Sequence, residues 1–293
     1  MGAFKWKALY WVILSVAFLP LVCSALLVLG TNIFLSLHDY TARTIATGAP
    51  FVGIANYSYA LTDSRFLNAL KVSFLFLVLC VVGETIVGVS LSYVFAKPLP
   101  RIISKGKVLI ILPLAISPAA ASLIWRWFFS TQYGIINFLL ALIGIQGPDW
   151  TARPTSALFA MVFVDLWQWV SFTFAVLLAA MQGIPAEVYE AASIDGASEW
   201  TKFWKITIPF LKRSLFQIVL FRFALLLREV DKPLILTQGG PGMATETISY
   251  WIYRCYFWFS QIGRAAAMAV ILLVIANIVC ETFWTLRGRW QNA

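Results

Sequence analysis

The sequence predicts an all-α membrane protein, a bundle of six transmembrane helices with a helix-turn-helix in one cytoplasmic loop. Hydrophobic residues make up 61% of the 293 residues and charged residues only 12%, whereas a soluble domain carries about 25% charged residues. This leaves too little polar surface to cover a water-exposed globule. The hydrophobic residues also gather in six runs, each about as long as the roughly 20 helical residues that cross a bilayer.

The six runs are expected to form the membrane spans of a single transmembrane domain over residues 1–293, in the order 8–37, 67–96, 108–129, 157–181, 214–236 and 265–286. The first run exceeds the roughly 7–15 residues of a signal-peptide core, so it is predicted to be an uncleaved helix. The fifth run is unusually polar, because it contains Arg222 and then the charged stretch 228–232.

The distribution of lysine and arginine orients these spans. One set of connections contains most of the basic residues, and the positive-inside rule places this set in the cytoplasm: Lys5, Lys7, Lys97, Arg101, Lys105, Lys107, Lys202, Lys205, Lys212, Arg213, Arg287 and Arg289. The opposite connections contain Arg43, Arg65, Arg153, Arg254 and Arg264, mostly singly. Both termini are therefore expected inside, and these loops account for the net charge of +9 without a nucleic-acid partner.

Catalytic and metal-binding classes find little support. The four cysteines form no C-x-x-C pair, and the single histidine, His38, cannot build a histidine-based metal site. The sequence also contains no G-x-x-x-x-G-K-[ST] phosphate-binding loop. We therefore expect no catalytic residue, no metal and no cofactor bound by this chain.

The stretch EAASIDGASEWTKFWKITIP, residues 190–209, is polar and lies between the fourth and fifth spans. Pro185 suits a helix start, and Gly196 suits a left-handed cap at its end. A second helix is expected from the N-cap Ser198 to Pro209, with an aromatic face formed by Trp200, Phe203, Trp204 and Thr207. The aromatic residues either dock a partner or pack under the ends of the spans, and the residues alone leave these alternatives open.

Ionisable residues inside the spans are costly and need a role. Lys71 and Arg126 lie near helix ends, where their charges can reach the interface. Glu84 lies in the middle of the second span, where we expect it to pair with Arg222.

Several motifs now resemble one family. Glu190-Ala191-Ala192, Asp195-Gly196-Ala197, Phe203, Ile206, Ile208 and Pro209 resemble the EAA signature of permease subunits in bacterial and archaeal ATP-binding-cassette importers, with Ile208 replacing the usual leucine. LTQGGPG at 236–242 and FVGIANY at 51–57 are similar to elements of the carbohydrate-type permeases. The resemblance is strongest to the first permease of maltose and sn-glycerol-3-phosphate systems.

The resemblance implies a coupling role for the polar loop, residues 182–213. Its coupling residues would fit a cleft of a partner ATPase subunit: Glu190, Ala191, Ala192, Asp195, Gly196, Ala197, Trp200 and Phe203. The implied partners are a second permease in a heterodimer, two ATPase subunits that bind ATP and Mg, an extracytoplasmic solute-binding protein and membrane lipid. The implied location is the bacterial or archaeal plasma (inner) membrane, and the implied solute is a sugar, polyol or glycerol derivative.

A second group of residues is a candidate for the translocation path of such a solute: Asp165, Trp167, Gln168, Arg228, Glu229 and Asp231. Carboxylates and amides bind sugar hydroxyls, and tryptophans stack on sugar faces. Glu229 and Val230 depart from the asparagine and phenylalanine that the family often has here. The alternative role for these residues is helix packing through ion pairs.

Two other functional classes fit the sequence less well. A secondary transporter or channel would use the buried charges as an ion path, but it leaves the EAA stretch unexplained, and no inverted repeat is visible in the spans. An intramembrane enzyme lacks a metal or nucleophile motif.

Overall fold

The computed structural model describes the backbone of residues 2–291 and the side chains of residues 16 and 18–285. Over this range the regular secondary structure is helical, with two isolated β-bridges, so the predicted all-α class is confirmed. The chain divides into two compact units. The first contains Met1–Asp63 and Ile252–Val279, and the second contains Ser64–Trp251 and Cys280–Ala293.

The first unit contains α1 (Gly2–Ser36), α2 (Ala55–Thr62) and most of α13 (Ile262–Gln291). Asn56, at the start of α2, donates hydrogen bonds from its amide to the carbonyl oxygens of Ser36 at 2.9 Å and His38 at 3.0 Å. These bonds satisfy carbonyls at the end of α1 that have no partner within the helix. The 51–57 motif thus fastens the α1–α2 connection. The helix α12 (Ile248–Phe257) crosses the boundary between the units along the chain.

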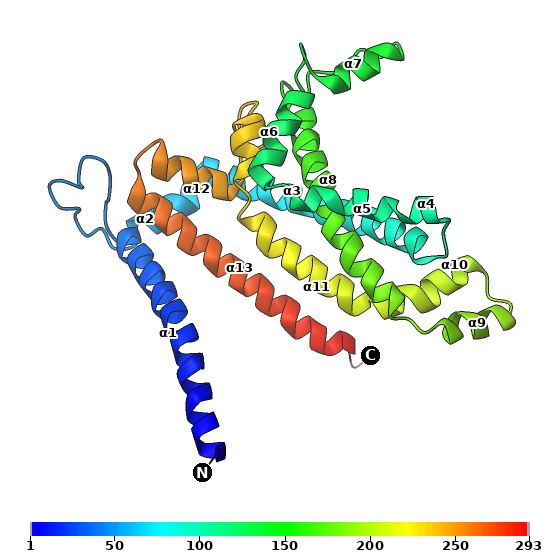
Figure 1. Ribbon diagram of the computed structural model, residues 1–293. Coiled ribbons are helices and arrows are strands. Elements are labelled where there is room, and N and C mark those ends of the chain that lie inside the picture. Colours follow the sequence, from blue (N-terminus) through cyan, green and yellow to red (C-terminus); the bar gives the residue numbers. More distant parts are fainter. Residues whose placement is uncertain (1, 292–293) are drawn as a thin grey trace. The chain divides into compact units, whose positions relative to one another are not determined.

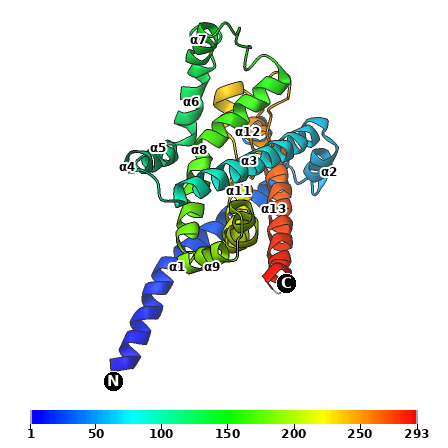
Figure 2. The same ribbon diagram turned by 90° about the vertical axis from the view of Figure 1, so that its right-hand side faces the viewer.

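The second unit is built on three long helices, α3 (Ser64–Ala96), α8 (Pro154–Gln182) and α11 (Ile208–Leu227). α3 packs along α8, and α11 packs against both (Figures 1 and 2). The closest approach uses Gly88 of α3, where a Cβ atom would overlap the Thr173 side chain of α8. Nearby, the Ser92 hydroxyl donates to the carbonyl oxygen of Phe174 across the two helices at 3.1 Å. Small and hydroxylated residues are the usual means of close helix packing in membranes.

The expected third span, 108–129, is a broken helix. It contains α5 (Gly106–Ile111), preceded by α4 (Arg101–Ser104), then a 3₁₀ turn and α6 (Pro118–Phe128). The two halves are bent by 103° at the break, as in a broken span or re-entrant loop. Ser117 caps α6 by accepting a hydrogen bond from the Ala120 amide, and Pro118 follows as its first residue.

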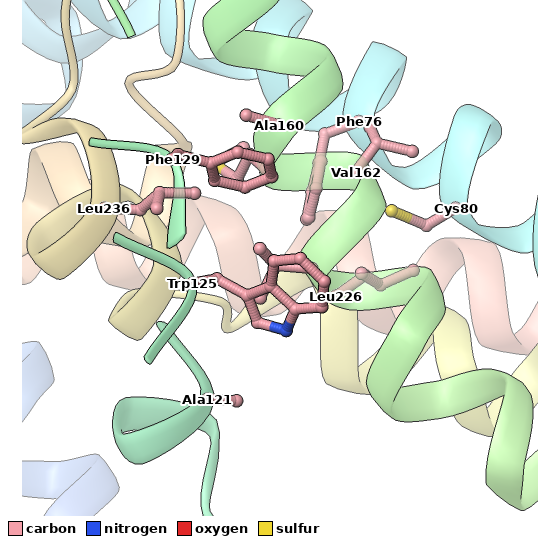
Figure 3. Close-up of a cluster of buried hydrophobic side chains, with 11 residues drawn as sticks. Phe76, Cys80, Ala121, Trp125, Phe129, Ala160, Val162, Leu226 and Leu236 are labelled. Atoms are coloured by element: carbon pink, nitrogen blue, oxygen red, sulfur yellow. The ribbon is translucent and has the colours of Figure 1, made fainter. Parts of the chain in front are cut away.

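The main core of the second unit lies where α3, α6 and α8 meet, and Figure 3 shows Trp125 of α6 in the middle of it. The Trp125 ring contacts Phe163 and Trp167 of α8 edge-on, at centroid distances of 4.9 and 5.4 Å. Leu236 joins this core from the π-helical segment Pro233–Thr237. The apolar helix α7 (Ile135–Leu142) follows α6.

Four helical segments in the described residues are long and apolar enough to cross a membrane: Phe18–Ser36, Ser64–Ala96, Pro154–Gln182 and Ile262–Thr285. The broken pair makes a fifth if it counts as one span. The expected span 214–236 differs from the structure, because α11 begins at Ile208 and ends at Leu227. The count of six spans stays a prediction. The side chains of Lys5, Lys7, Arg287 and Arg289, used to orient the ends, lie outside the described residues.

Candidate functional site

The polar loop between α8 and α11 forms a hairpin of α9 (Ala186–Ile194) and α10 (Glu199–Lys202). The turn is made by Gly196 at φ +76°, and the Ala197 amide donates back to the carbonyl oxygen of Ala192 at 2.9 Å. Ser198 caps α10 by accepting a hydrogen bond from the Thr201 amide at 3.2 Å. The expected left-handed glycine and serine cap are therefore both present.

The hairpin is joined to α11 without a break in the helical backbone. α10 continues into the π-helical segment Phe203–Thr207, which runs directly into Ile208. Pro209 was expected to end the second hairpin helix, and it does not. The reason is the wider π turn, in which the Ile208 amide donates to Phe203, five residues earlier. Proline is tolerated in the first turn of the α-helix that follows.

The predicted aromatic face of α10 divides between surface and core. Trp200 is 71% exposed and Trp204 is 51% exposed. Phe203 packs edge-on against Tyr93 of α3 at a centroid distance of 4.9 Å. Thr207 is buried and shares a hydrogen bond with the Tyr189 hydroxyl at 2.9 Å. Packing therefore accounts for Phe203 and Thr207 but leaves the two tryptophans free to contact a partner.

The other predicted coupling residues lie around the turn. Glu190, Ala191, Asp195 and Gly196 are exposed, whereas Ala192 and Ala197 are half-buried. The exposed residues surround the tip of the hairpin and are accessible to another protein.

Glu199 connects the hairpin to the end of α3. Its carboxylate accepts hydrogen bonds from Lys97 at 2.6 Å and from Lys202 at 3.1 Å. The hydrogen bond from Lys97, followed by that from Lys202, lowers the pKa of the Glu199 carboxyl to about 2. The same pair raises the pKa of Lys97. Both side chains are therefore charged at neutral pH.

A buried ion network lies between the three long helices. Arg222 of α11 donates two hydrogen bonds to Glu84 of α3, at 2.7 and 2.6 Å, so the expected pairing is present. Arg222 also contacts Asp165 of α8 and lies over the Trp169 ring at 4.3 Å. Glu84, Arg222 and Asp165 are at most 1% exposed.

Lys232 extends this network beyond the end of α11. Its ammonium lies 2.8 Å from Asp165 Oδ1 and 2.9 Å from Glu229 Oε2, and its side chain is fully buried. No role was predicted for Lys232, which in the sequence is one of several charged residues at 228–232. A signal for this contact was present in the sequence. Lys232 falls in the expected fifth span and Asp165 in the expected fourth, and a charge inside a span needs a partner of opposite sign.

A cavity of about 520 Å³ lies beside the network. Of the predicted path residues, it is lined by Gln168, Arg228, Glu229 and Asp231. The amide of Gln168 donates to the Ile116 carbonyl oxygen at 2.6 Å, which leaves its own oxygen without a protein partner. That oxygen is buried, so the polar groups of the cavity wall are the guanidiniums of Arg222 and Arg228 and the carboxylates of Glu229 and Asp231. These groups can bind the hydroxyls of a polar solute.

Two predicted path residues lie elsewhere. Asp165 is fully buried and does not line the cavity, because both of its oxygens face cations of the ion network. Trp167 packs against Trp125 in the main core. For Asp165 the geometry corresponds to the alternative role, helix packing through ion pairs.

Cys80, Glu84 and Asp165 are close enough to share a metal ion, with ligand atoms within 4.8 Å of one another. The two carboxylates already contact Arg222 and Lys232. The carboxylate oxygens that could bind a metal ion are thus already paired with cationic side chains of the chain itself.

The chain is similar to known transport proteins over most of its length. Residues 108–284 match the model of the family described as binding-protein-dependent transport system inner membrane component. A trehalose/maltose transport system permease protein of Thermococcus litoralis is 33% identical over 91% of this chain and 88% of its own. An osmoprotective compounds uptake permease protein of Synechocystis is 34% identical over 87% and 91%. An sn-glycerol-3-phosphate transport system permease protein of Agrobacterium fabrum is 33% identical over 82% of each chain.

The fold is also similar to a solved structure. A chain from the crystal structure of a bacterial ABC transporter involved in the import of the acidic polysaccharide alginate matches with a TM-score of 0.81 and 21% identity, over 97% of this chain and 98% of that one. The family match covers more than half of the chain, and the chain therefore belongs to the binding-protein-dependent transport system inner membrane components.

Proposed function

We propose that this chain is one of two permease subunits of an ATP-driven importer and that its hairpin receives the movement of an ATPase subunit. The observation that carries the proposal is the continuous helix from α10 through the π segment into α11. Movement imposed on exposed Trp200 would be transmitted to the helix that bears Arg222 and leads to the cavity. This is the physical requirement for coupling a cytoplasmic event to a membrane path.

The proposed assembly has a second permease, two ATPase subunits that bind ATP and Mg, and a solute-binding protein on the outer side. The family description supports a binding-protein partner. A related structure, a bacterial alginate ABC transporter, is in complex with an alginate pentasaccharide-bound periplasmic protein and matches with a TM-score of 0.77. Both termini of the present chain would face the cytoplasm.

The proposed solute is a sugar, polyol or glycerol derivative. Trehalose/maltose and sn-glycerol-3-phosphate are named for relatives at 33% identity. The cavity supports a hydroxyl-rich solute because Glu229 and Asp231 offer acceptors and Arg228 offers donors. The second permease would supply the other wall of the path.

The test compares ATP hydrolysis with solute uptake in the complete transporter. Proline fixes φ near −65°, so Gly196→Pro cannot adopt the φ of +76° at the turn. Glu190→Lys reverses an exposed charge in the middle of α9. We expect either variant to assemble with the second permease but to lose solute-dependent ATP hydrolysis and uptake together. Glu187→Lys, which makes the same charge change one turn earlier in α9, serves as the matched control.

Normal transport by Gly196→Pro and Glu190→Lys would contradict the coupling role. Uptake that persists in membranes without any ATPase subunit would instead support the alternative, a secondary transporter or channel.

A further inference from the structure

One carboxylate contacts residues on either side of the point where α11 ends. The helix ends at Leu227, and the turn 228–232 leads into the π-helical segment that starts at Pro233. Arg222 lies before this break and Lys232 after it, and both contact Asp165 of α8. Asp165 thus bridges two parts of the chain that the helix itself no longer connects.

The ion pairs that form this bridge are buried, so each charge depends on its partner. The side chains of Asp165, Lys232 and Arg222 are all buried. A charge in such a place needs its partner, because water is absent to replace it. Loss of either partner should therefore move the turn rather than leave an unpaired charge in place.

The turn 228–232 is also stabilised by hydrogen bonds within itself and by one hydrogen bond to Thr247. The Glu229 carboxylate accepts hydrogen bonds from the Lys232 backbone amide at 3.0 Å and from its ammonium at 2.9 Å. The Glu229 carbonyl oxygen accepts a bond from the Thr247 hydroxyl at 2.8 Å. Lys232 is therefore the link through which the turn is attached to α8.

This attachment concerns the cavity, because the residues enclosed by the turn are those that line it. Arg228, Glu229, Val230 and Asp231 all contribute to the wall. The facing wall includes Gln168, which lies one helical turn after Asp165 on the same side of α8. One turn of α8 thus supplies both the anchor and the opposite wall.

We propose that Asp165 and Lys232 are a positioning pair that fixes the 228–231 turn at a set separation from Gln168 and thereby defines the width of the cavity. Neither residue contacts the cavity itself. The consequence for solute transport rests on the proposed function, whereas the position of the turn does not.

The test measures the turn directly in the complete transporter, without a solute. Val230→Cys places a thiol in the cavity wall, in a background with the exposed Cys23 and the half-buried Cys280 replaced by serine and the buried Cys80 and Cys255 retained. The probe is a small, charged methanethiosulfonate reagent, and the readout is its labelling rate. We expect Asp165→Asn or Lys232→Met to change this rate several-fold.

Two comparisons separate positioning from general loss of structure. Glu84→Gln neutralises an equally buried acid of the same network that does not contact Lys232, and it should leave the labelling rate at the level of the parent. The double variant Asp165→Asn with Lys232→Met removes the same link as either single variant, so its labelling rate should differ from the parent by about as much as the larger single change and not by the product of the two. The double-mutant cycle gives the coupling between the two sites.

Assembly of the single variants at the parent level with an unchanged labelling rate would overturn the proposal, as would a shift of equal size in Glu84→Gln. Where a neutral variant fails to assemble, Asp165→Glu keeps the charge but lengthens the side chain by one methylene. This change should push Lys232 and the turn away from α8 and still alter the rate, and an unaltered rate would again overturn the proposal.

Discussion

Arg222 of α11 donates two hydrogen bonds to the Glu84 carboxylate of α3, from Nε to Oε2 at 2.7 Å and from Nη2 to Oε1 at 2.6 Å. This forked geometry matches a planar guanidinium to a carboxylate, which lysine cannot reproduce. Asp165 adds a second acid to the same guanidinium. Arg222 is therefore the residue on which two other helices converge.

Removal of Arg222 should cost more than removal of Glu84. Arg222→Met leaves the buried Glu84 without its partner, and breaking such a pair costs about 3–5 kcal/mol. Glu84→Gln should cost less, because Arg222 keeps Asp165. Thermal unfolding in detergent measures the difference. The double variant should recover much of the loss, and a double variant as unstable as Arg222→Met would contradict the pairing as the cause.

Gly88→Ala should weaken the packing of α3 on α8. The added Cβ would overlap the Thr173 side chain, so the helices must move apart, and overpacking of this kind costs about 1–3 kcal/mol. Gly30→Ala is the matched control, because no atom lies within 4 Å of a Cβ at that position. The free energy of unfolding should fall only for Gly88→Ala. Equal stability of the two variants would show that the contact at Gly88 is not tight.

Alanine variants of Phe203 and Trp200 should distinguish a packing role from a docking role. Phe203→Ala removes the ring that packs on Tyr93, and we expect a loss of about 2–3 kcal/mol in permease stability, since the ring is only partly buried. Trp200→Ala should leave that stability unchanged, because the ring is 71% exposed. If the proposed docking is correct, Trp200→Ala instead reduces co-purification of the ATPase subunit. Reversed results for the two variants would contradict this division.

The contact of Glu199 with Lys97 should be insensitive to pH in the neutral range. The folded pKa of Glu199 is about 2, below its ordinary value of 4.5. A lowered carboxyl pKa means that the stabilisation is present above 4.5 and disappears as the pH falls toward 2. Proteolysis of the hairpin should thus be constant between about pH 6 and pH 8 and should increase with salt, because the pair is exposed. Glu199→Gln should remove the salt effect.

Asp231→Ala should alter uptake without reducing assembly. The carboxylate lines the cavity and makes no contact with the ion network among the described residues. Its loss should change the concentration dependence of transport for hydroxyl-rich solutes while the amount of assembled transporter stays constant. Asp63→Ala, at a residue that follows α2 and does not line this cavity, is the control. Unchanged uptake across a panel of sugars and polyols would remove Asp231 from the path.

The sequence was most informative where the chemistry is local. The left-handed turn at Gly196 and the cap at Ser198 depend on neighbouring residues, and both are present. The Glu84–Arg222 pair was also predictable, because an apolar setting demands a partner for each charge. The bend within 108–129 had a signal in Pro113, Ser117 and Pro118, which are typical of a helix break.

Other features depend on the three-dimensional arrangement. Lys232 reaches Asp165 only because α11 ends at Leu227, and no glycine or proline marks that end before Pro233. The helix continues through Pro209 because a π turn absorbs the missing amide, which residue propensities do not reveal. Asp165 and Trp167 were assigned to the path from their residue types alone. Their helical positions place Asp165 in the ion network and Trp167 against the main core, and a role for either in the path stays a prediction.

The uninterrupted helical backbone from Glu199 to Leu227 has a mechanical consequence. At 1.5 Å per residue, Trp200 and Arg222 lie about 33 Å apart along this backbone. If the hairpin docks an ATPase subunit as proposed, no loop interrupts the path by which a displacement of Trp200 would reach Arg222, the residue that joins three helices. The wider π turn at Phe203–Thr207 lies within that path, so its stiffness would set how much of the displacement arrives.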